Sequence, residues 1–344
     1  MTTMKIKQII PINGPMPIRD PYIMGVHHYD IYPKGNGNMG PSEDISDRRI
    51  GNDFDPTKKW RMYHGEKVPG FPHHPHRGFE ICSIVDEGFA DHFDSKGSKG
   101  RYGDGDIQLM SAGAGVLHSE MFPLIYDEKE NPLRLFQIWI NLPSGSKLTP
   151  PDYKMIWKEN VPTKSFEDAD GNSVRIRVVM GEYEGVKAVD PLPYSWAADP
   201  AHHMGIALVD LDPNAEFTLP IVSESLSRFV LFYDGEGEIQ VDDASVRVNH
   251  LLDLYGNQAI TFKNGTAKSK ILILEGEPIN EPVAAYGPFV MNTELELQEA
   301  FAEYRRTEFG GWPWGDTEMD LVNEKNAGRF ASYSFGEVID RPEN

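Results

Sequence analysis

Two short histidine motifs in this chain have the residue types and the spacing of a metal site. His74 and His76 are separated by a proline, and His118 and Glu120 are separated by a serine. In an extended strand, residues two apart project to the same face. If the two strands face each other across a barrel, three imidazoles and one carboxylate converge on one point. The spacing therefore predicts a metal centre.

The residue types also indicate which metal such a centre would take. Neutral imidazoles and a carboxylate suit a borderline divalent ion. Four protein ligands leave two positions on an octahedral ion open for substrate, oxygen or water, so a purely structural metal is the least favoured alternative. We expect Fe(II), with manganese, nickel, copper and zinc as alternatives. Glu120 is the candidate for two tasks, as a ligand and, once detached, as the catalytic base.

Other residues near the motifs compete for a role at the site. Glu80 is the rival ligand, because it follows His76 by four residues, and its expected task is to orient an imidazole N–H. His64 and His92 are isolated histidines that we expect to be structural or solvent-exposed. Cys82 is the single cysteine, which excludes an internal disulfide, and its apolar surroundings predict a buried, inert thiol.

Composition and charge restrict the classes of partner. The 344 residues include 33 Lys and Arg against 53 Asp and Glu, a formal net charge of -20. Such a surface repels phosphate backbones, so we expect no direct nucleic-acid binding, and a transcriptional role would require a protein partner. No stretch approaches the ~18 apolar residues of a membrane span. The N-terminus has no apolar signal segment, so we expect a cytoplasmic protein.

The pattern along the chain predicts a mainly all-β fold. Short apolar or alternating runs bounded by turn residues recur from about residue 79 to 275. Strands without intervening helices favour sandwiches or barrels over a parallel sheet. The runs that begin at Phe79 and Phe229 share an apolar strand, an acidic turn with glycine and a second strand, which indicates a duplicated barrel.

The duplication predicts the domain order. We expect a metal-binding barrel over residues 1–145, a second barrel over 152–290, and a short helix with a packed tail over 291–344. The proline- and glycine-rich stretch between the barrels is the expected linker. Thr293 and Glu296 fit a capping box at the start of the helix.

The second barrel is expected to be metal-free. At the places that correspond to the ligands, or close to them, it carries four residues that form no His-x-His motif: Ser225, Ser227, Phe262 and Asn264.

Around the two histidine motifs, and in a segment after the second barrel, the sequence resembles the pirin family of the cupin superfamily. The segments HPHRGFE and QLMSAGAGVLHSEM are similar to its N-terminal signature, and GEPINEPVAAYGPFVMNT is similar to a segment that follows its second barrel. The resemblance runs from about Ile6 to Glu303. It implies a bicupin, with two cupin-type β-barrels in tandem and one iron in the N-terminal barrel. The ligands that it implies are the four already reached from strand geometry: His74, His76, His118 and Glu120.

The resemblance also implies a function. Some pirins resemble quercetin 2,3-dioxygenases, which open a flavonol ring with O2 and release carbon monoxide. We therefore expect an iron-dependent oxidoreductase acting on a small aromatic or enolisable substrate and O2. Other pirins are described as transcriptional cofactors whose surface responds to the oxidation state of the iron. The alternative is accordingly a metal-binding regulatory protein, a redox-sensitive cofactor of a protein partner without physiological turnover.

The chain departs from the family pattern in three places. A polar, glycine-rich excursion over residues 33–70 is longer than pirins generally have, and the tail after Gly310 is extended. His73 stands where an aspartate commonly precedes the His-Pro-His. Loops as long as the excursion are usually functional lids or disordered insertions, and we expect this one to lie over the barrel mouth. We expect all three departures to affect the mouth of the substrate pocket.

Overall fold

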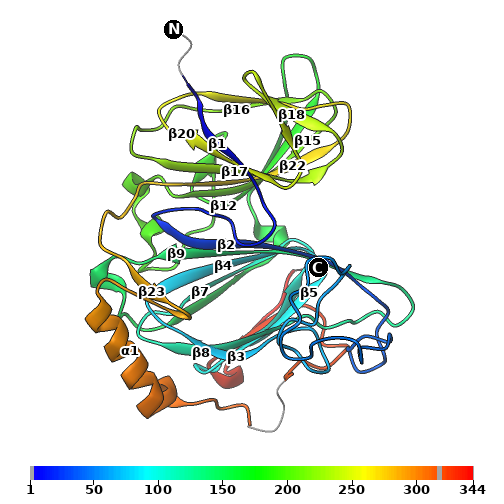
Figure 1. Ribbon diagram of the computed structural model, residues 1–344, viewed down its shortest axis with the longest axis vertical. Coiled ribbons are helices and arrows are strands. Elements are labelled where there is room, and N and C mark those ends of the chain that lie inside the picture. The colour runs from blue at the N-terminus through cyan, green and yellow to red at the C-terminus, as the bar shows by residue number, and fades with distance from the viewer. Residues whose placement is uncertain (1–3, 316–319, 344) are drawn as a thin grey trace. The chain divides into compact units, whose positions relative to one another are not determined.

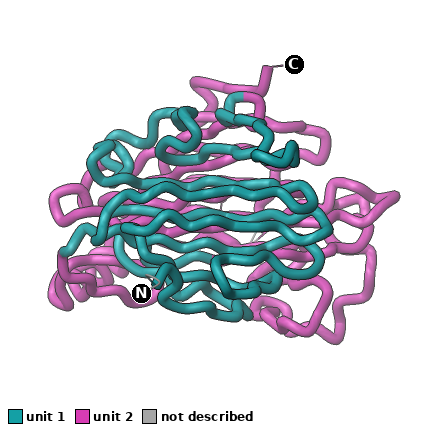
Figure 2. Tube along the Cα trace, turned by 90° about the horizontal axis from the view of Figure 1, so that it is seen from above, with its two compact units in different colours: residues 1–25, 160–280 teal, residues 26–159, 281–344 magenta. Residues whose placement is uncertain are grey.

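The computed structural model describes residues 4–315 and 320–343, and these are organised mainly as β-strands (Figure 1). The all-β prediction is therefore confirmed. Contacts divide the chain into two compact units (Figure 2). Unit 1 contains residues 1–25 and 160–280, and unit 2 contains residues 26–159 and 281–344.

Unit 2 contains two large sheets. The five-stranded sheet has the order β10-β7-β4-β9-β2, and the six-stranded sheet has the order β26-β25-β6-β5-β8-β3. The strands of the first sheet are β2 (Tyr22–Tyr32, which begins in unit 1), β4 (Phe79–Glu87), β7 (Asp106–Ser111), β9 (Asn131–Asn141) and β10 (Asp152–Ile156). The strands of the second sheet are β3 (Gly70–His76), β5 (Phe89–Asp94), β6 (Lys99–Gly103), β8 (Val116–Met121), β25 (Phe330–Tyr333) and β26 (Val338–Asp340).

The core of unit 2 joins these two sheets. Val85 and Leu135 of the five-stranded sheet and Ala90 and Tyr102 of the six-stranded sheet belong to one buried apolar cluster. The sheets therefore pack face to face as the two halves of a cupin-like barrel, and the hydrogen-bonded ladder between them is not closed.

Unit 1 repeats this plan with a different interior. Its seven-stranded sheet has the order β1-β20-β17-β22-β15-β12-β11, its four-stranded sheet the order β16-β21-β18-β19, and β13 pairs with β14. The strands are β1 (Ile6–Pro11), β11 (Thr163–Glu167), β12 (Ser173–Met180), β13 (Glu182–Tyr183), β14 (Val186–Lys187), β15 (Gly205–Leu211), β16 (Glu216–Leu219), β17 (Ser227–Gly235), β18 (Glu238–Val241), β19 (Ala244–Arg247), β20 (His250–Tyr255), β21 (Ile260–Lys263) and β22 (Ser269–Gly276). Apolar side chains from both large sheets fill the interior, and Phe262 is buried among them.

The two units differ from the boundaries expected from the sequence. The N-terminal strand β1 pairs with β20 of unit 1, so the chain begins in the unit that contains the second repeat. The expected linker is also different, because β10 pairs with β7 inside unit 2 and the chain enters unit 1 only after Glu159. Strand pairing between distant segments decides both boundaries.

The C-terminal helix α1 (Glu294–Thr307) begins at the predicted capping box. The backbone N–H of Glu296 donates to Thr293 Oγ1 at 3.2 Å, and the N–H of Thr293 donates to Glu296 Oε2 at 2.9 Å. Leu297 and Ala300 are buried against Phe289, which lies in the hairpin of β23 (Ala284–Tyr286) and β24 (Phe289–Met291). Among the described residues, six 3-10 turns complete the regular structure: Ser144–Ser146, Lys158–Asn160, Trp196–Ala198, Pro200–His202, Glu308–Gly310 and Ser334–Gly336.

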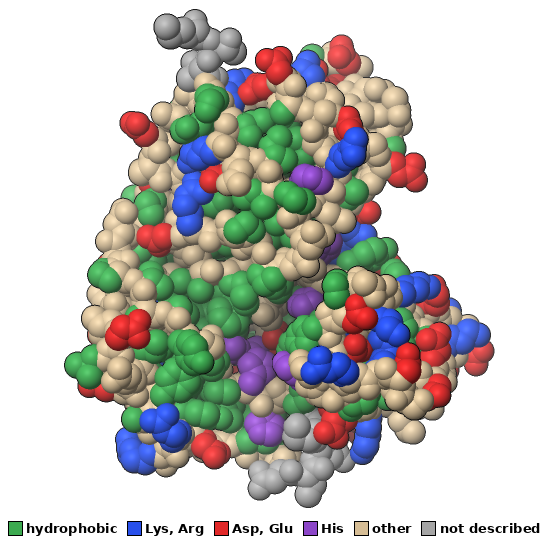
Figure 3. Space-filling model, in the orientation of Figure 1, with side chains coloured by type: hydrophobic (Ala, Val, Ile, Leu, Met, Phe, Trp, Pro, Cys, Tyr) green, Lys and Arg blue, Asp and Glu red, His purple; other side chains and the backbone are tan. Residues whose placement is uncertain are grey.

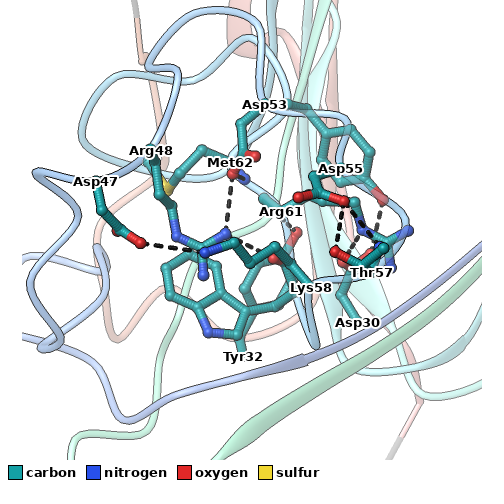
Figure 4. A network of polar contacts seen from close by, with 12 residues as sticks. Asp30, Tyr32, Asp47, Arg48, Asp53, Asp55, Thr57, Lys58, Arg61 and Met62 are labelled. Atoms are coloured by element: carbon teal, nitrogen blue, oxygen red, sulfur yellow. Dashed lines mark hydrogen bonds and ion pairs between the residues drawn. The ribbon is translucent and has the colours of Figure 1, made fainter.

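The excursion between β2 and β3 lacks regular strands, but its side chains pack against the barrel strands of unit 2. Trp60, Met62 and Tyr63 are buried in the same apolar cluster as the strands of the barrel. A polar network fixes the outer part of the segment (Figure 4). Within residues 4–315 and 320–343, no helix combines the length and the apolar character needed to cross a membrane.

Candidate metal centre

Antiparallel pairing of β3 with β8 brings the two predicted motifs together. His74 lies directly opposite His118, and Phe71 lies opposite Glu120. Three residues on β3 therefore span the same length as two on β8, which is a β-bulge between Phe71 and His74. The bulge sets which β3 side chains stand beside the His118 imidazole.

The three histidines form a compact cluster in the interior of unit 2. The potential ligand atoms of His74, His76 and His118 all lie within 4.8 Å of one another. Their ring centroids are 4.5 Å apart for His74 and His118, 4.7 Å for His74 and His76, and 4.9 Å for His76 and His118. Figure 3 shows histidine side chains (purple) gathered in a hollow of the surface.

Hydrogen bonds orient two of the rings. His74 Nδ1 lies 2.8 Å from the carbonyl oxygen of Pro72, and His76 Nδ1 lies 3.3 Å from that of Pro288. Because a carbonyl only accepts, each Nδ1 carries the proton and each Nε2 keeps its lone pair. This is the arrangement by which proteins orient metal-binding imidazoles.

The surroundings of the His118 ring show whether the cluster fits a metal ion. It is fully buried, yet neither ring nitrogen has a hydrogen-bond partner among residues 4–315 and 320–343. Buried polar atoms without a partner are rare because leaving water without a new bond costs free energy. A cation bound at one nitrogen would supply that partner, so the residues present fit a metal ion.

Burial keeps the three imidazoles in the form that binds metals. It lowers the pKa of His74 to about 4 and lowers the pKa values of His76 and His118 well below their usual range. The neighbouring imidazoles act in the same direction, since each would repel a second positive charge. All three rings are therefore neutral near pH 7, with lone pairs available.

Glu120 stands beside this cluster and is held by two side chains. Its Oε2 lies 3.7 Å from His118 Nε2. The Gln137 amide donates to the same Oε2 at 2.6 Å, and the Ser83 hydroxyl donates to Oε1 at 3.3 Å. Burial raises the pKa of Glu120, and the two hydrogen bonds oppose that shift by stabilising the carboxylate.

The sequence-based reasoning missed two residues at this site. His92, expected to be structural or exposed, is fully buried in β5 opposite Glu120, with its ring 5.6 Å from that of His118. Gln137 was not considered, although it holds Glu120. The alternation along β5 places His92 and Asp94 on one face, but only the pairing of β5 with β8 shows which neighbour that face meets.

The other residues considered have simpler positions. Glu80 is fully buried on β4, and it does not belong to the three-residue cluster of close ligand atoms. Cys82 is fully buried as predicted, and burial raises the pKa of its thiol, which leaves it protonated and unreactive. Trp139 of β9 packs against His76 at 5.2 Å and donates to the Gln137 side-chain oxygen at 3.1 Å.

Comparison with known proteins supplies independent information on this arrangement. The family model described as Pirin matches residues 43–140, and the model described as Pirin C-terminal cupin domain matches residues 206–310. The chain is 33% identical to human pirin over 261 residues, covering 75% of this chain and 83% of that protein. It is 35% identical to Pirin-1 of Arabidopsis thaliana over 245 residues, covering 70% and 78%.

Two further matches carry an enzyme's name. A Pseudomonas aeruginosa protein provisionally named a quercetin 2,3-dioxygenase is 34% identical over 242 residues, covering 69% of this chain and 79% of its own. The crystal structure of a quercetin 2,3-dioxygenase from Acinetobacter baumannii superposes with a TM-score of 0.68 at 26% identity, covering 90% of this chain and 99% of that one. The family matches and this superposition confirm the predicted bicupin fold.

Proposed function

Because the chain belongs to the pirin family, as its similarity over most of the length of several pirins establishes, we propose that unit 2 is an iron-dependent dioxygenase. Its substrate is a flavonol such as quercetin, which it cleaves with O2. The Fe(II) ligands are the side chains of His74, His76 and His118, with Glu120 as the fourth ligand. The observation that carries this proposal is the buried cluster of three neutral imidazoles, in which His118 has no hydrogen-bond partner among the described residues.

The protein groups around the cluster prepare the site for this chemistry. Bound Fe(II) supplies Lewis acidity and open positions for a substrate oxygen and O2. The carbonyls of Pro72 and Pro288 keep Nε2 of His74 and His76 available. Phe79 and Trp139 pack on the His76 ring at 5.1 and 5.2 Å and exclude water from that side.

Glu120 is the residue that takes the proton of the substrate hydroxyl. Its Oε1 is the accepting atom, because Oε2 already accepts the short bond from Gln137 while the Ser83 contact to Oε1 is longer. Burial raises the pKa of Glu120 towards the working pH, which favours a base that must accept and later return a proton. The Trp139 indole fixes the Gln137 oxygen, so the amide faces Glu120.

The names of two similar proteins support the choice of substrate. The Acinetobacter baumannii enzyme is called a quercetin 2,3-dioxygenase, and the Pseudomonas aeruginosa relative carries the same name provisionally. A planar flavonol with adjacent hydroxyl and carbonyl oxygens offers the enolisable group that a base beside a Lewis acid can use.

The experiment that tests the proposal is anaerobic loading of the purified chain with Fe(II), followed by quercetin and O2. We expect flavonol loss and carbon monoxide release in equal amounts, both lost in His76→Ala and both retained in His250→Ala, which removes a histidine of unit 1. Parallel loading with manganese, nickel, copper and zinc identifies the most active metal. Tight metal binding with no turnover would contradict the enzyme proposal and favour the metal-binding regulatory protein.

A further inference from the structure

The excursion, His73 and the C-terminal tail meet at β3, beside the histidine cluster. Phe54 and His64 of the excursion pack on Phe71, the second residue of β3. His73 stacks on Trp312 of the extended tail, with ring centroids 4.9 Å apart and planes at 16°. Aromatic side chains from outside the barrel therefore surround the strand that carries His74 and His76.

Phe54, His64 and Phe71 form a continuous set of rings, here called the aromatic wall. The centroid distances are 4.9 Å for Phe54 and His64, 5.6 Å for His64 and Phe71, and 6.2 Å for Phe54 and Phe71. Phe71 continues the set to His74 at 6.5 Å, in an edge-to-face arrangement. The wall thus leads from the surface to the first of the clustered imidazoles.

The outer rings of the wall, those of Phe54 and His64, are exposed and do not belong to the core. Phe54 is 44% exposed and His64 is exposed, whereas Tyr63 behind them is buried. Phe71 is half-buried. An exposed phenylalanine by itself needs no explanation, but three rings in edge-to-face or tilted contact that end at a candidate metal centre offer aromatic surface to another ring.

A dense polar network holds this part of the excursion in one conformation (Figure 4). The Asp53 carboxylate accepts from the Met62 N–H and from Arg48, each at 2.9 Å, and the Arg48 guanidinium lies 3.5 Å from the centroid of Trp60.

Further hydrogen bonds hold the wall itself. The backbones of Asp53 and Tyr63 exchange two hydrogen bonds, at 2.8 and 3.1 Å, which places Phe54 and His64 as neighbours. His64 Nδ1 donates to the Gly51 carbonyl at 2.7 Å. The wall is therefore preorganised and loses little conformational entropy when a ligand binds.

We propose that the aromatic wall binds the outer ring of a planar aromatic substrate and selects such substrates over small enolisable ones. The selectivity comes from Phe54 and His64, which only the excursion supplies. This inference rests on the proposed function, because it concerns the substrate of the same site. It assigns to the excursion a role in substrate specificity.

The test compares two substrates in the Fe(II)-loaded full chain: quercetin, and acetylacetone as a small enolisable diketone. In Phe54→Ala we expect the ratio of kcat/KM for quercetin to that for the diketone to fall about tenfold, through KM, because loss of the ring removes about 1.4 kcal/mol of binding free energy. Phe54→Tyr should restore the ratio. Phe335→Ala removes a phenylalanine that is 62% exposed elsewhere on unit 2, and should leave the ratio unchanged.

Anaerobic binding of quercetin, followed by fluorescence, separates failure of this inference from failure of the proposed function. A Kd that rises about tenfold in Phe54→Ala supports the wall even if the wild-type chain turns over neither substrate. Unchanged binding and an unchanged ratio in a correctly folded Phe54→Ala, alongside normal wild-type turnover, would overturn the wall and leave the dioxygenase proposal intact.

Discussion

His118 Nε2 and Glu120 Oε2 lie 3.7 Å apart on one face of β8. The separation of two residues puts both side chains inside the barrel. Their hydrogen bonds differ: Glu120 accepts from Gln137 and Ser83, whereas His118 has no hydrogen bond within the part of the chain that the structure describes. This difference is the basis on which we propose Glu120 for proton transfer and His118 as a metal ligand.

Glu120→Gln should lower turnover by about 10²- to 10⁴-fold, because the amide keeps the shape of the side chain but cannot accept the substrate proton. Glu80→Gln is the matched control, since Glu80 is equally buried on the neighbouring sheet but lies outside the cluster of close ligand atoms. Initial rates of flavonol loss measure both. Equal rates in wild type and Glu120→Gln would remove Glu120 from the mechanism.

Metal loading should raise the thermal stability of the wild-type chain, because an ion that binds only the folded state stabilises it by an amount that rises with the logarithm of its concentration relative to its Kd. We expect chelation to lower the Tm of the wild type and His118→Ala to abolish the difference between loaded and chelated protein. Metal content is measured on the same samples. A His118→Ala variant that retains one tightly bound ion would show that the three-histidine cluster is not the site.

The stability of the chain should fall as the pH is lowered from about 6.5 to about 4, in part through His28. Burial, reinforced by the positive charge of Arg61, lowers the pKa of His28 to about 4. The unfolded chain therefore binds more protons in this window, so its population rises as the pH falls. The stabilising effect of a neutral His28 is complete above about pH 6.5.

His28→Gln should reduce the slope of stability against pH by up to one proton, about 1.4 kcal/mol per pH unit at most. Denaturant unfolding of apoprotein between pH 4 and 7 measures this slope. His203→Gln, which replaces an exposed histidine of unit 1, is the control. An identical slope in His28→Gln and wild type would contradict the assignment.

Arg48→Ala should destabilise the chain by about 3 kcal/mol, because it leaves the buried Asp53 carboxylate without its cation. Lys58→Ala removes an exposed partner of Asp47 in the same network and should cost less than about 1 kcal/mol. Both residues are drawn in Figure 4. Chemical denaturation of the two variants compares them directly, and equal effects would show that burial of the Arg48 pair does not matter.

Much of the fold and half of the site could be predicted from local patterns. The alternation of apolar residues indicated the strands, and Thr293 and Glu296 indicated the start of α1 at the correct residue. A spacing of two placed His74 with His76, and His118 with Glu120, without any tertiary information. These predictions succeed because side-chain direction in a strand and capping at a helix end depend on neighbours only a few residues away.

The tertiary structure decided what depends on distant partners. Pairing of β5 with β8 brought His92 opposite Glu120, and pairing of β1 with β20 placed the N-terminus in unit 1. The bulge in β3 and the tilted contact of the Phe54 ring with Phe71 likewise depend on segments that the sequence does not mark as neighbours. The sequence alone determined which residue types could do chemistry and which face of a strand they share. Only the folded chain determined which other faces they meet, because strand register is set by pairing across the whole sheet.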